Sequence, residues 1–207
     1  MDHSIVEAVD GLCEWCHAMH LPWHASAADQ FGLYISLLIH AQKQTNLTGF
    51  STPASIVASL FVDSLQILRV KMPTISIVDI GTGAGFPGIP IKILLPETAT
   101  ILVEPRTKRY AFLRLVEREL GLDSIEIHKC RMESLVLKQV PEMVISKAFA
   151  PLPQWLELVK PWASQGAEVG CLASQKDWAT LNLTQLGYKH AGSIEENQRV
   201  YAVVKAL

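Results

Sequence analysis

The stretch IVDIGTGAGFPGIPIKILLP, residues 77–96, decides the fold of this chain. An apolar run ends at Asp79, and three glycines follow at alternate positions, Gly81, Gly83 and Gly85. Glycine adopts positive φ angles readily and lets another molecule approach the backbone closely. The stretch therefore predicts a buried strand followed by a loop that holds a ligand.

The rest of the chain places this stretch first in an alternating series of strands and helices. Apolar runs typical of strands occur at residues 75–80, 99–104, 124–128, 142–146, 167–172 and 200–205. Most are separated by segments with helical spacing, of which 107–120 is the clearest. Such alternation predicts a Rossmann-like, doubly wound α/β domain with a mostly parallel sheet. The last strand is expected to follow a short connection containing Gly192 and to pair antiparallel at the edge.

The part of the chain before this series has a different spacing of apolar residues. Apolar residues recur at helical spacing over residues 4–20, 27–44 and 54–69. We therefore expect an N-terminal helical cap, residues 1–70, on an α/β domain, residues 71–207.

Composition and charge limit the classes of function. Hydrophobic residues make up 49% of the 207 residues and charged residues 18%, which is typical of a globular protein. No apolar run reaches the ~18 residues of a membrane span, and the N-terminus lacks the basic start of a signal peptide. A cytoplasmic monomer without bound metal is expected. The formal net charge is −2, so contact with nucleic acid requires a local basic patch.

The cysteines allow several interpretations. The sequence C-E-W-C-H from Cys13 to His17 matches the pattern of covalent haem attachment. Cys13 and Cys16 also lie on one apolar face of the first predicted helix, where cysteine packs as a small hydrophobe. Core packing is the simplest interpretation, and a zinc site or haem or redox chemistry are the alternatives. Cys130 and Cys171 lie in separate apolar segments, which also predicts packing.

The glycine loop fits more than one cofactor. Residues 83–88 match G-x-G-x-x-G, the pattern of dinucleotide-binding loops. Pro87 and Pro90 remove N–H donors that a pyrophosphate would need. Glu104, at the end of the second strand, can accept hydrogen bonds from ribose hydroxyls in either cofactor class. A glycine turn with solvated acids and an NAD(P) site are the alternatives to the interpretation that follows.

Asp79 favours a ligand that carries an ammonium group. S-Adenosyl-L-methionine has one, and the pattern D-x-G-x-G-x-G resembles the fingerprint loop of class I methyltransferases, which implies this cofactor. The stretch ISKAFAPLP, residues 145–153, lacks the Asn/Asp-Pro-Pro-aromatic motif of amino-group methyltransferases of nucleic acids, and no Pro-Cys pair offers a nucleophile. A ring nitrogen with a free lone pair, such as guanine N7, needs neither that motif nor a nucleophilic cysteine. The enzyme only has to align the nitrogen with the methyl group and exclude water.

Segments along nearly the whole chain resemble one family, the bacterial small-subunit ribosomal RNA guanine-N7 methyltransferases, also called the glucose-inhibited division protein B family. The segments are NLT at 46–48, DS at 63–64, DIGTGAGFPGIPIKILLP at 79–96, KRYAFL at 108–113, RMESL at 131–135, ISKAFA at 145–150 and RVYAVVKA at 199–206. The resemblance implies a cytoplasmic enzyme that methylates N7 of one guanine in 16S rRNA. It places cofactor contacts at Gly81, Phe86, Met132, Glu133 and Lys147.

Three cationic residues are the candidates for holding the cofactor's amino-acid end or the RNA. Lys147 is expected at the tip of the fourth strand, facing the transferred methyl group, and is the catalytic candidate. Arg131 and Arg199 are expected in loops of the active face and are the candidates for RNA contact.

The chain departs from the family pattern at four places. Leu60 stands where the family has histidine, Pro105 where it has serine, and Lys147 where it has arginine. The segment CLASQKDW, residues 171–178, replaces a Leu-Lys-Gly sequence. These departures concern guanine and RNA handling, because none of them lies in the glycine loop.

Overall fold

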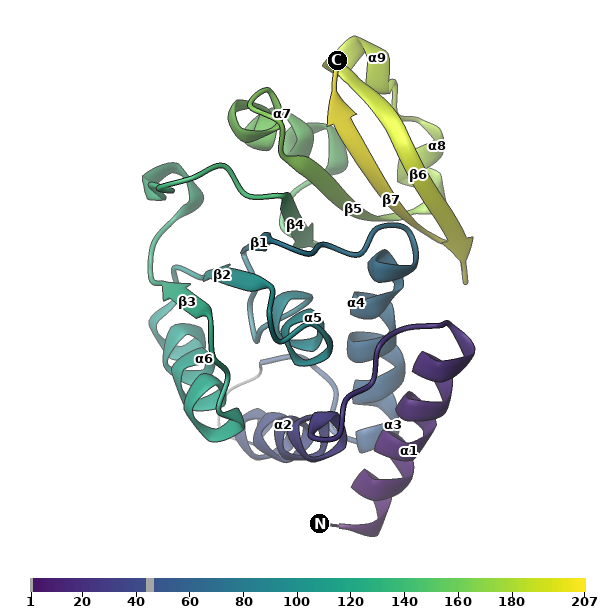
Figure 1. Cartoon of the computed structure of the whole chain (residues 1–207), viewed down its shortest axis with the longest axis vertical. Coiled ribbons are helices and arrows are strands. Elements are labelled where there is room, and N and C mark those ends of the chain that lie inside the picture. Colours follow the sequence, from purple (N-terminus) through teal and green to yellow (C-terminus); the bar gives the residue numbers. More distant parts are fainter. Residues whose placement is uncertain (1, 44–46) are drawn as a thin grey trace.

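A seven-stranded sheet runs through the computed structural model, which describes residues 2–43 and 47–207, and helices cover both of its faces (Figure 1). The strand order is β3-β2-β1-β4-β5-β7-β6. The strands are β1 Ser76–Ile80, β2 Ala99–Val103, β3 Ile125–His128, β4 Met143–Lys147, β5 Glu168–Ser174, β6 Tyr188–Glu196 and β7 Arg199–Ala206.

The helices come from the N-terminal part of the chain and from the connections between strands. They are α1 His3–Ala18, α2 Ala27–Gln42, α3 Pro53–Ile56, α4 Asp63–Leu65, α5 Gly88–Leu94, α6 Thr107–Leu120, α7 Leu152–Ala163, α8 Gln175–Ala179 and α9 Leu183–Leu186. A π-helix, η1 Val57–Val62, joins α3 to α4, and the 3₁₀ helices are η2 Gln66–Arg69 and η3 Met132–Ser134. No helix in the described part of the chain is both long and apolar enough to span a bilayer.

The first strand is apolar because both of its faces are buried. Ile77 belongs to the core that the N-terminal helices, α5 and α6 form on one face, whereas Val78 and Ile80 belong to the core under α7 on the other. Parallel strands covered on both faces have continuous apolar sequences for this reason. β1 pairs in parallel with β2 and β4, so its carboxyl end lies in the middle of the sheet edge.

The predicted doubly wound sheet is confirmed, and its C-terminal end differs in one respect. β7 is antiparallel to β5, as expected. However, β6 pairs with the other side of β7 and forms the edge of the sheet. Gly192 lies inside β6 at a bulge rather than in a connection. The turn between β6 and β7 is formed by Asn197 and Gln198, which both have positive φ angles, 51° and 61°. The apolar-run criterion missed β6 because most of its side chains are partly or fully exposed.

The N-terminal helices share one hydrophobic core with the sheet. The three predicted helical segments are present, as α1, α2 and the helical run from Pro53 to Arg69. Cys16 is fully buried in this core, as core packing predicted, whereas Cys13 is half-buried. The division into a cap and a domain at residue 70 stays a prediction.

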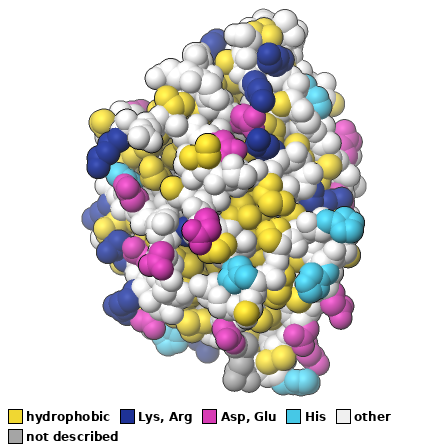
Figure 2. All heavy atoms as spheres, in the orientation of Figure 1, with side chains coloured by type: hydrophobic (Ala, Val, Ile, Leu, Met, Phe, Trp, Pro, Cys, Tyr) yellow, Lys and Arg dark blue, Asp and Glu magenta, His cyan; other side chains and the backbone are white. Residues whose placement is uncertain are grey.

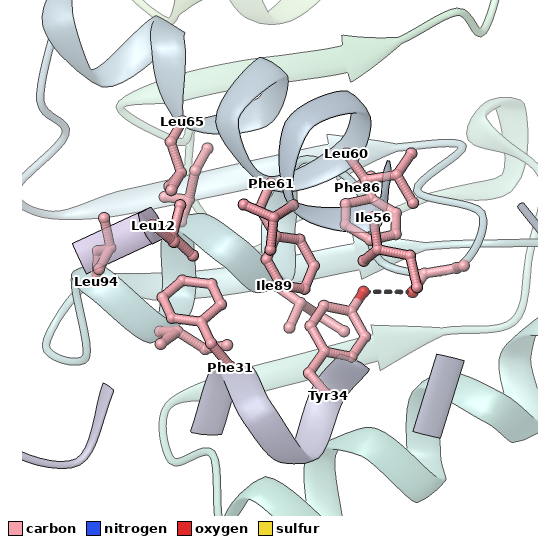
Figure 3. Close-up of a cluster of buried hydrophobic side chains, with 14 of the residues drawn as sticks. Leu12, Phe31, Tyr34, Ile56, Leu60, Phe61, Leu65, Phe86, Ile89 and Leu94 are labelled. Atoms are coloured by element: carbon pink, nitrogen blue, oxygen red, sulfur yellow. Dashed lines mark hydrogen bonds between the residues drawn. The ribbon is translucent and has the colours of Figure 1, made fainter. Parts of the chain in front are cut away.

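An aromatic cluster links the N-terminal helices to the glycine loop (Figure 3). Phe31 and Tyr34 of α2 pack against Phe61, and Tyr34 and Phe61 pack against Phe86, with ring centroids 5.1–5.9 Å apart. The Tyr34 hydroxyl donates a 2.7 Å hydrogen bond to the carbonyl of Ala84, in the loop itself. The N-terminal helices therefore help to set the shape of the loop.

Phe61→Ala should lower the free energy of unfolding by about 3–5 kcal/mol, because it removes a fully buried aromatic ring from the centre of this cluster. Urea denaturation would measure the change. The control is Leu33→Ala, whose side chain is exposed on α2 and whose loss should have a small effect. A loss below ~1 kcal/mol for Phe61→Ala would contradict the role assigned to the cluster.

Candidate active site

The carboxylate of Asp79 holds the two ends of the glycine loop. It is fully buried at the end of β1, and its Oδ2 atom accepts hydrogen bonds from the Thr82 hydroxyl at 2.6 Å and from the Gly88 N–H at 2.8 Å. Its Oδ1 atom is buried and has no hydrogen-bond partner among the described residues. Asp79 thus fixes the loop from behind, and one of its oxygens remains unsatisfied.

The glycines of the loop serve different purposes. A Cβ atom on Gly81 would lie 2.4 Å from Cδ2 of Phe149, and one on Gly85 would lie 2.4 Å from Cδ1 of Ile89. A Cβ atom on Gly83 would have no heavy-atom neighbour closer than 3.7 Å. All three glycines have positive φ angles. Gly85 is therefore required by core packing and Gly81 by its contact with the Phe149 ring, whereas the loop has room for a side chain beside Gly83.

Glu104 connects the end of β2 to the same loop. Its Oε2 atom accepts a hydrogen bond from the Gly83 N–H at 3.1 Å and lies 3.7 Å from Nη1 of Arg109. Its Oε1 atom accepts from the Arg106 N–H at 2.8 Å. The carboxylate is buried, and it braces the loop rather than lining the cavity beside it.

A cavity of about 490 Å³ lies beyond the carboxyl ends of β1, β2 and β3. This is where open α/β sheets bind their ligands. Its lining combines apolar side chains with a few cationic and acidic ones. The lining residues are Ile80, Gly81, Val103, Pro105, Arg106, Cys130, Arg131, Met132, Glu133 and Phe149.

A second, smaller cavity of about 230 Å³ lies beside the first, beyond β4 and β5. Phe149 lines both cavities and stands between them. Arg199, at the start of β7, and Asp177, in α8, line the second cavity only.

Asp63 is the centre of an ionic network next to the second cavity. Its Oδ2 atom lies 2.5 Å from Nζ of Lys147, and its Oδ1 atom lies 2.8 Å from Nε of Arg199. The Tyr201 hydroxyl donates a 2.6 Å hydrogen bond to Oδ1, and Nζ of Lys147 also donates to the carbonyl of Ser59. Burial lowers the pKa of Lys147, and the neighbouring Asp63 carboxylate opposes that shift.

The structure brings four of the predicted site residues to the first cavity, namely Gly81, Arg131, Met132 and Glu133. Asp79, Gly83, Gly85 and Glu104 form the scaffold behind it. Arg199 begins β7 and lines the second cavity, and Lys147 ends β4 as expected. Two predicted side chains lie away from both cavities. The Phe86 side chain is buried in the aromatic cluster, and Lys147 points to Asp63 and lines neither cavity.

Sequence reasoning missed two residues that organise the site. Asp63 belongs to the DS segment of the family resemblance, and an acid within the apolar helical stretch 56–68 is a signal of a buried ion pair. Phe149 follows Lys147 by two residues and was not singled out. The first residue of the NLT segment, Asn46, lies outside the described residues.

The sheet order, the glycine loop and the cavity beside it define a class I methyltransferase. The chain belongs to the family described as rRNA small subunit methyltransferase G, whose family model matches residues 27–200. This membership confirms the prediction of an S-adenosylmethionine-dependent ribosomal RNA methyltransferase.

Individual relatives agree with this family. The ribosomal RNA small subunit methyltransferase G of Wolinella succinogenes is 38% identical over 142 residues, which are 69% of this chain and 72% of that protein. The protein of the same name from Thermoanaerobacter sp. (strain X514) is 29% identical over 205 residues, 95% of this chain and 83% of that one. Among solved structures, a ribosomal protein L11 methylase from Lactobacillus delbrueckii subsp. bulgaricus superimposes with a TM-score of 0.55 at 12% identity, covering 70% of this chain and 77% of that one, which shows the shared fold.

Asp63→Asn should destabilise the protein by about 3 kcal/mol, because it leaves the positive charges of Lys147 and Arg199 without their partner. This loss of stability should lie at the low end of the range for breaking a buried ion pair, because the Arg199 side chain is 37% exposed and its charge is screened by water. Urea denaturation measures it against Asp10→Asn, an exposed aspartate of α1. Equal stability of the two variants would refute the network's structural role.

Asp79 should make stability depend on pH in a particular direction. Burial raises the pKa of its carboxyl from 3.8 to about 7, against the opposing hydrogen bonds from Thr82 and Gly88. The folded state therefore holds this proton more tightly than the unfolded state, so its contribution to stability is largest below pH ~4 and is lost as the pH rises to ~7.

Asp79→Asn removes this titration and keeps an oxygen that can accept both hydrogen bonds. The free energy of unfolding of the wild type minus that of Asp79→Asn should fall between pH ~4 and ~7 and be level on either side. Urea denaturation across this range gives the difference. A difference that stays constant or rises with pH would show that the carboxyl is not held in its protonated form.

Proposed function

We propose that this chain transfers the methyl group of S-adenosylmethionine to N7 of one guanine in 16S rRNA, as a cytoplasmic enzyme. The observation that carries the proposal is the first cavity, which lies beside the glycine loop of a chain that belongs to the rRNA small subunit methyltransferase G family. The proposal is finer than the family description, because it names the base, the acceptor atom and the rRNA.

The residues around the first cavity fit the cofactor. Gly81 presents bare backbone to the cavity, and the buried Met132 offers an apolar, adaptable side chain to a flat ring. Oδ1 of Asp79 is buried without a partner among the described residues, and Asp79 directly precedes Ile80 and Gly81, which line the cavity. A buried carboxyl oxygen without a partner favours a nearby ligand with a cationic amino group, and such a cation would in turn lower the raised pKa of Asp79 and favour its ionised form.

We assign the cofactor to the backbone of Gly81 and to the side chains of Met132 and Glu133. Asp79, Gly83, Gly85 and Glu104 hold the loop in its binding shape through the contacts described above. Phe86 contributes from the core through the loop it anchors. S-Adenosylmethionine supplies an activated methyl group on a sulfonium.

The acceptor atom requires no catalytic base. Neutral guanine carries a lone pair on N7, which forms the new N–C bond while the sulfur keeps the electrons of the broken S–C bond. No proton leaves in this step, so the protein needs only to align the two groups and exclude water. In this assignment Lys147, tied to Asp63 and to the Ser59 carbonyl, positions the end of β4 rather than moving a proton.

Basic side chains at the two cavities supply local contacts for RNA phosphates. Arg106 and Arg131 line the first cavity, and Arg199 lines the second. Figure 2 shows basic side chains at several separate places on one face of the molecule, interspersed with acidic ones. RNA contact thus depends on these local groups, in agreement with the net charge of −2.

The direct test is methyl transfer to 16S rRNA isolated from cells that lack this gene. The wild-type protein and labelled S-adenosylmethionine should add one methyl group, which mass mapping of nuclease fragments should locate on a single 7-methylguanosine. The small ribosomal subunit from the same cells serves as a second substrate. Transfer to a different atom, or the absence of transfer to both the naked rRNA and the small subunit, would refute the proposal.

Gly81→Ala should weaken binding of S-adenosylmethionine at least about tenfold, the factor that corresponds to ~1.4 kcal/mol. The added methyl group collides with Phe149 and changes the bare backbone at the cavity. The matched control is Gly121→Ala, which has a similar positive φ angle but no neighbour within 4 Å. Isothermal titration calorimetry measures both. Wild-type affinity in Gly81→Ala would remove this loop from the cofactor site.

A further inference from the structure

The second cavity lies next to the first along the edge of the sheet. The sheet order places β1, β2 and β3 on one side of β4, and β5 and β7 on the other. The first cavity uses the ends of β1, β2 and β3, and the second uses those of β4 and β5. The two cavities are therefore neighbours along one sheet edge, with Phe149 between them.

Two buried polar groups of the second cavity have no partner. Oγ of Ser146 and Nε1 of Trp155 are buried, and neither has a hydrogen-bond partner among the described residues. Their residues are 6% and 3% exposed, and both line the cavity. A buried donor without a partner is unfavourable and rare in folded proteins. The wall of the cavity thus contains two polar groups whose hydrogen-bonding capacity the rest of the described chain leaves unused.

The apolar part of this lining suits a flat ring. Phe149 and Trp155 lie edge to face, with ring centroids 6.1 Å apart, and Phe149 is 40% exposed although it is aromatic. Aromatic side chains of this kind stack on bases that have left the helix. The small volume of the cavity, about 230 Å³, suits one base rather than a larger ligand.

Asp177 gives the far end of the cavity a chemical preference. Its Oδ2 atom accepts a 2.7 Å hydrogen bond from the Ser174 hydroxyl, and its backbone N–H donates to the same hydroxyl. The carboxylate lies beyond β5, on the side of the cavity away from β1. An ionised carboxylate can only accept hydrogen bonds. It therefore favours a base edge that carries donors.

We propose that the second cavity receives the acceptor guanine, flipped out of the RNA, and that Asp177 selects guanine by accepting from its N1–H and its 2-amino group. This inference rests on the proposed function. Guanine carries these donors on the edge opposite N7, whereas adenine has an acceptor at N1. With the donor edge at Asp177, N7 faces the first cavity past Phe149. This single orientation of the base thus explains both why guanine is selected and why its N7 atom is methylated.

The test uses RNA in which the mapped target guanine is replaced by inosine, which keeps N7, O6 and N1–H but lacks the 2-amino group. The wild type should transfer methyl to the inosine RNA about tenfold more slowly than to the guanine RNA. Asp177→Asn should transfer to guanine about 10- to 100-fold more slowly than the wild type and show little further loss with inosine. This variant keeps the contact with Ser174, so the fold should be preserved. Asp10→Asn, on exposed α1, is the matched control.

A second measurement separates base selection from catalysis. Fluorescence anisotropy measures RNA affinity in the presence of S-adenosylhomocysteine, with which no methyl transfer occurs. The RNA affinities should rank in the same order as the transfer rates. Calorimetry should give unchanged cofactor affinity for Asp177→Asn. Equal wild-type rates on the two RNAs, full activity of Asp177→Asn, or additive losses from the variant and the inosine would each overturn the inference. Absence of transfer by the wild type to the guanine RNA would instead refute the proposed function.

Discussion

The two hydrogen bonds to one oxygen of Asp79 are the constraint on which the site depends. They join the Thr82 hydroxyl to the first N–H of α5 across the glycine loop, in the middle of the sheet edge. With the loop fixed, the backbone of Gly81 lies beside the first cavity, which the Phe149 ring also lines. Glu104 and Tyr34 secure the same loop at Gly83 and Ala84, so strand, helix and loop form one unit.

Much of the fold could be predicted because burial on both faces makes parallel strands apolar throughout. β1, β2, β4 and β5 have this property, and so does β7, which β6 shields from the edge. β6 could not be found this way, since most of its side chains contact water and its sequence lacks an apolar run. Its pairing is specified by the two-residue turn at Asn197 and Gln198, a signal weaker than the Asn-Gly pair usual at such turns.

The candidate site was predicted less completely, for a different physical reason. A sequence motif indicates which residues lie near a ligand, but not which way each side chain turns. Phe86 lies in the predicted loop, yet its ring finds more apolar contact in the core than at the cavity. Lys147 ends β4 as expected, and the buried acid Asp63 holds its ammonium group. Such a pairing spans 84 positions and leaves no local pattern in the sequence.

The network around Asp63 also has a consequence for the order in which the molecule can be completed. Asp63 and its partner Tyr201 are 138 positions apart, and Arg199 comes from the same final strand. During synthesis on the ribosome, the carboxylate therefore emerges long before these two partners. The Asp177 side of the second cavity, closed by Arg199, is among the last parts to form. An incomplete chain without β7 lacks two partners of Asp63, and it also lacks Tyr201 and Val203 from the core that the N-terminal helices share with the sheet, so this ionic network and this core are completed together at the end of synthesis.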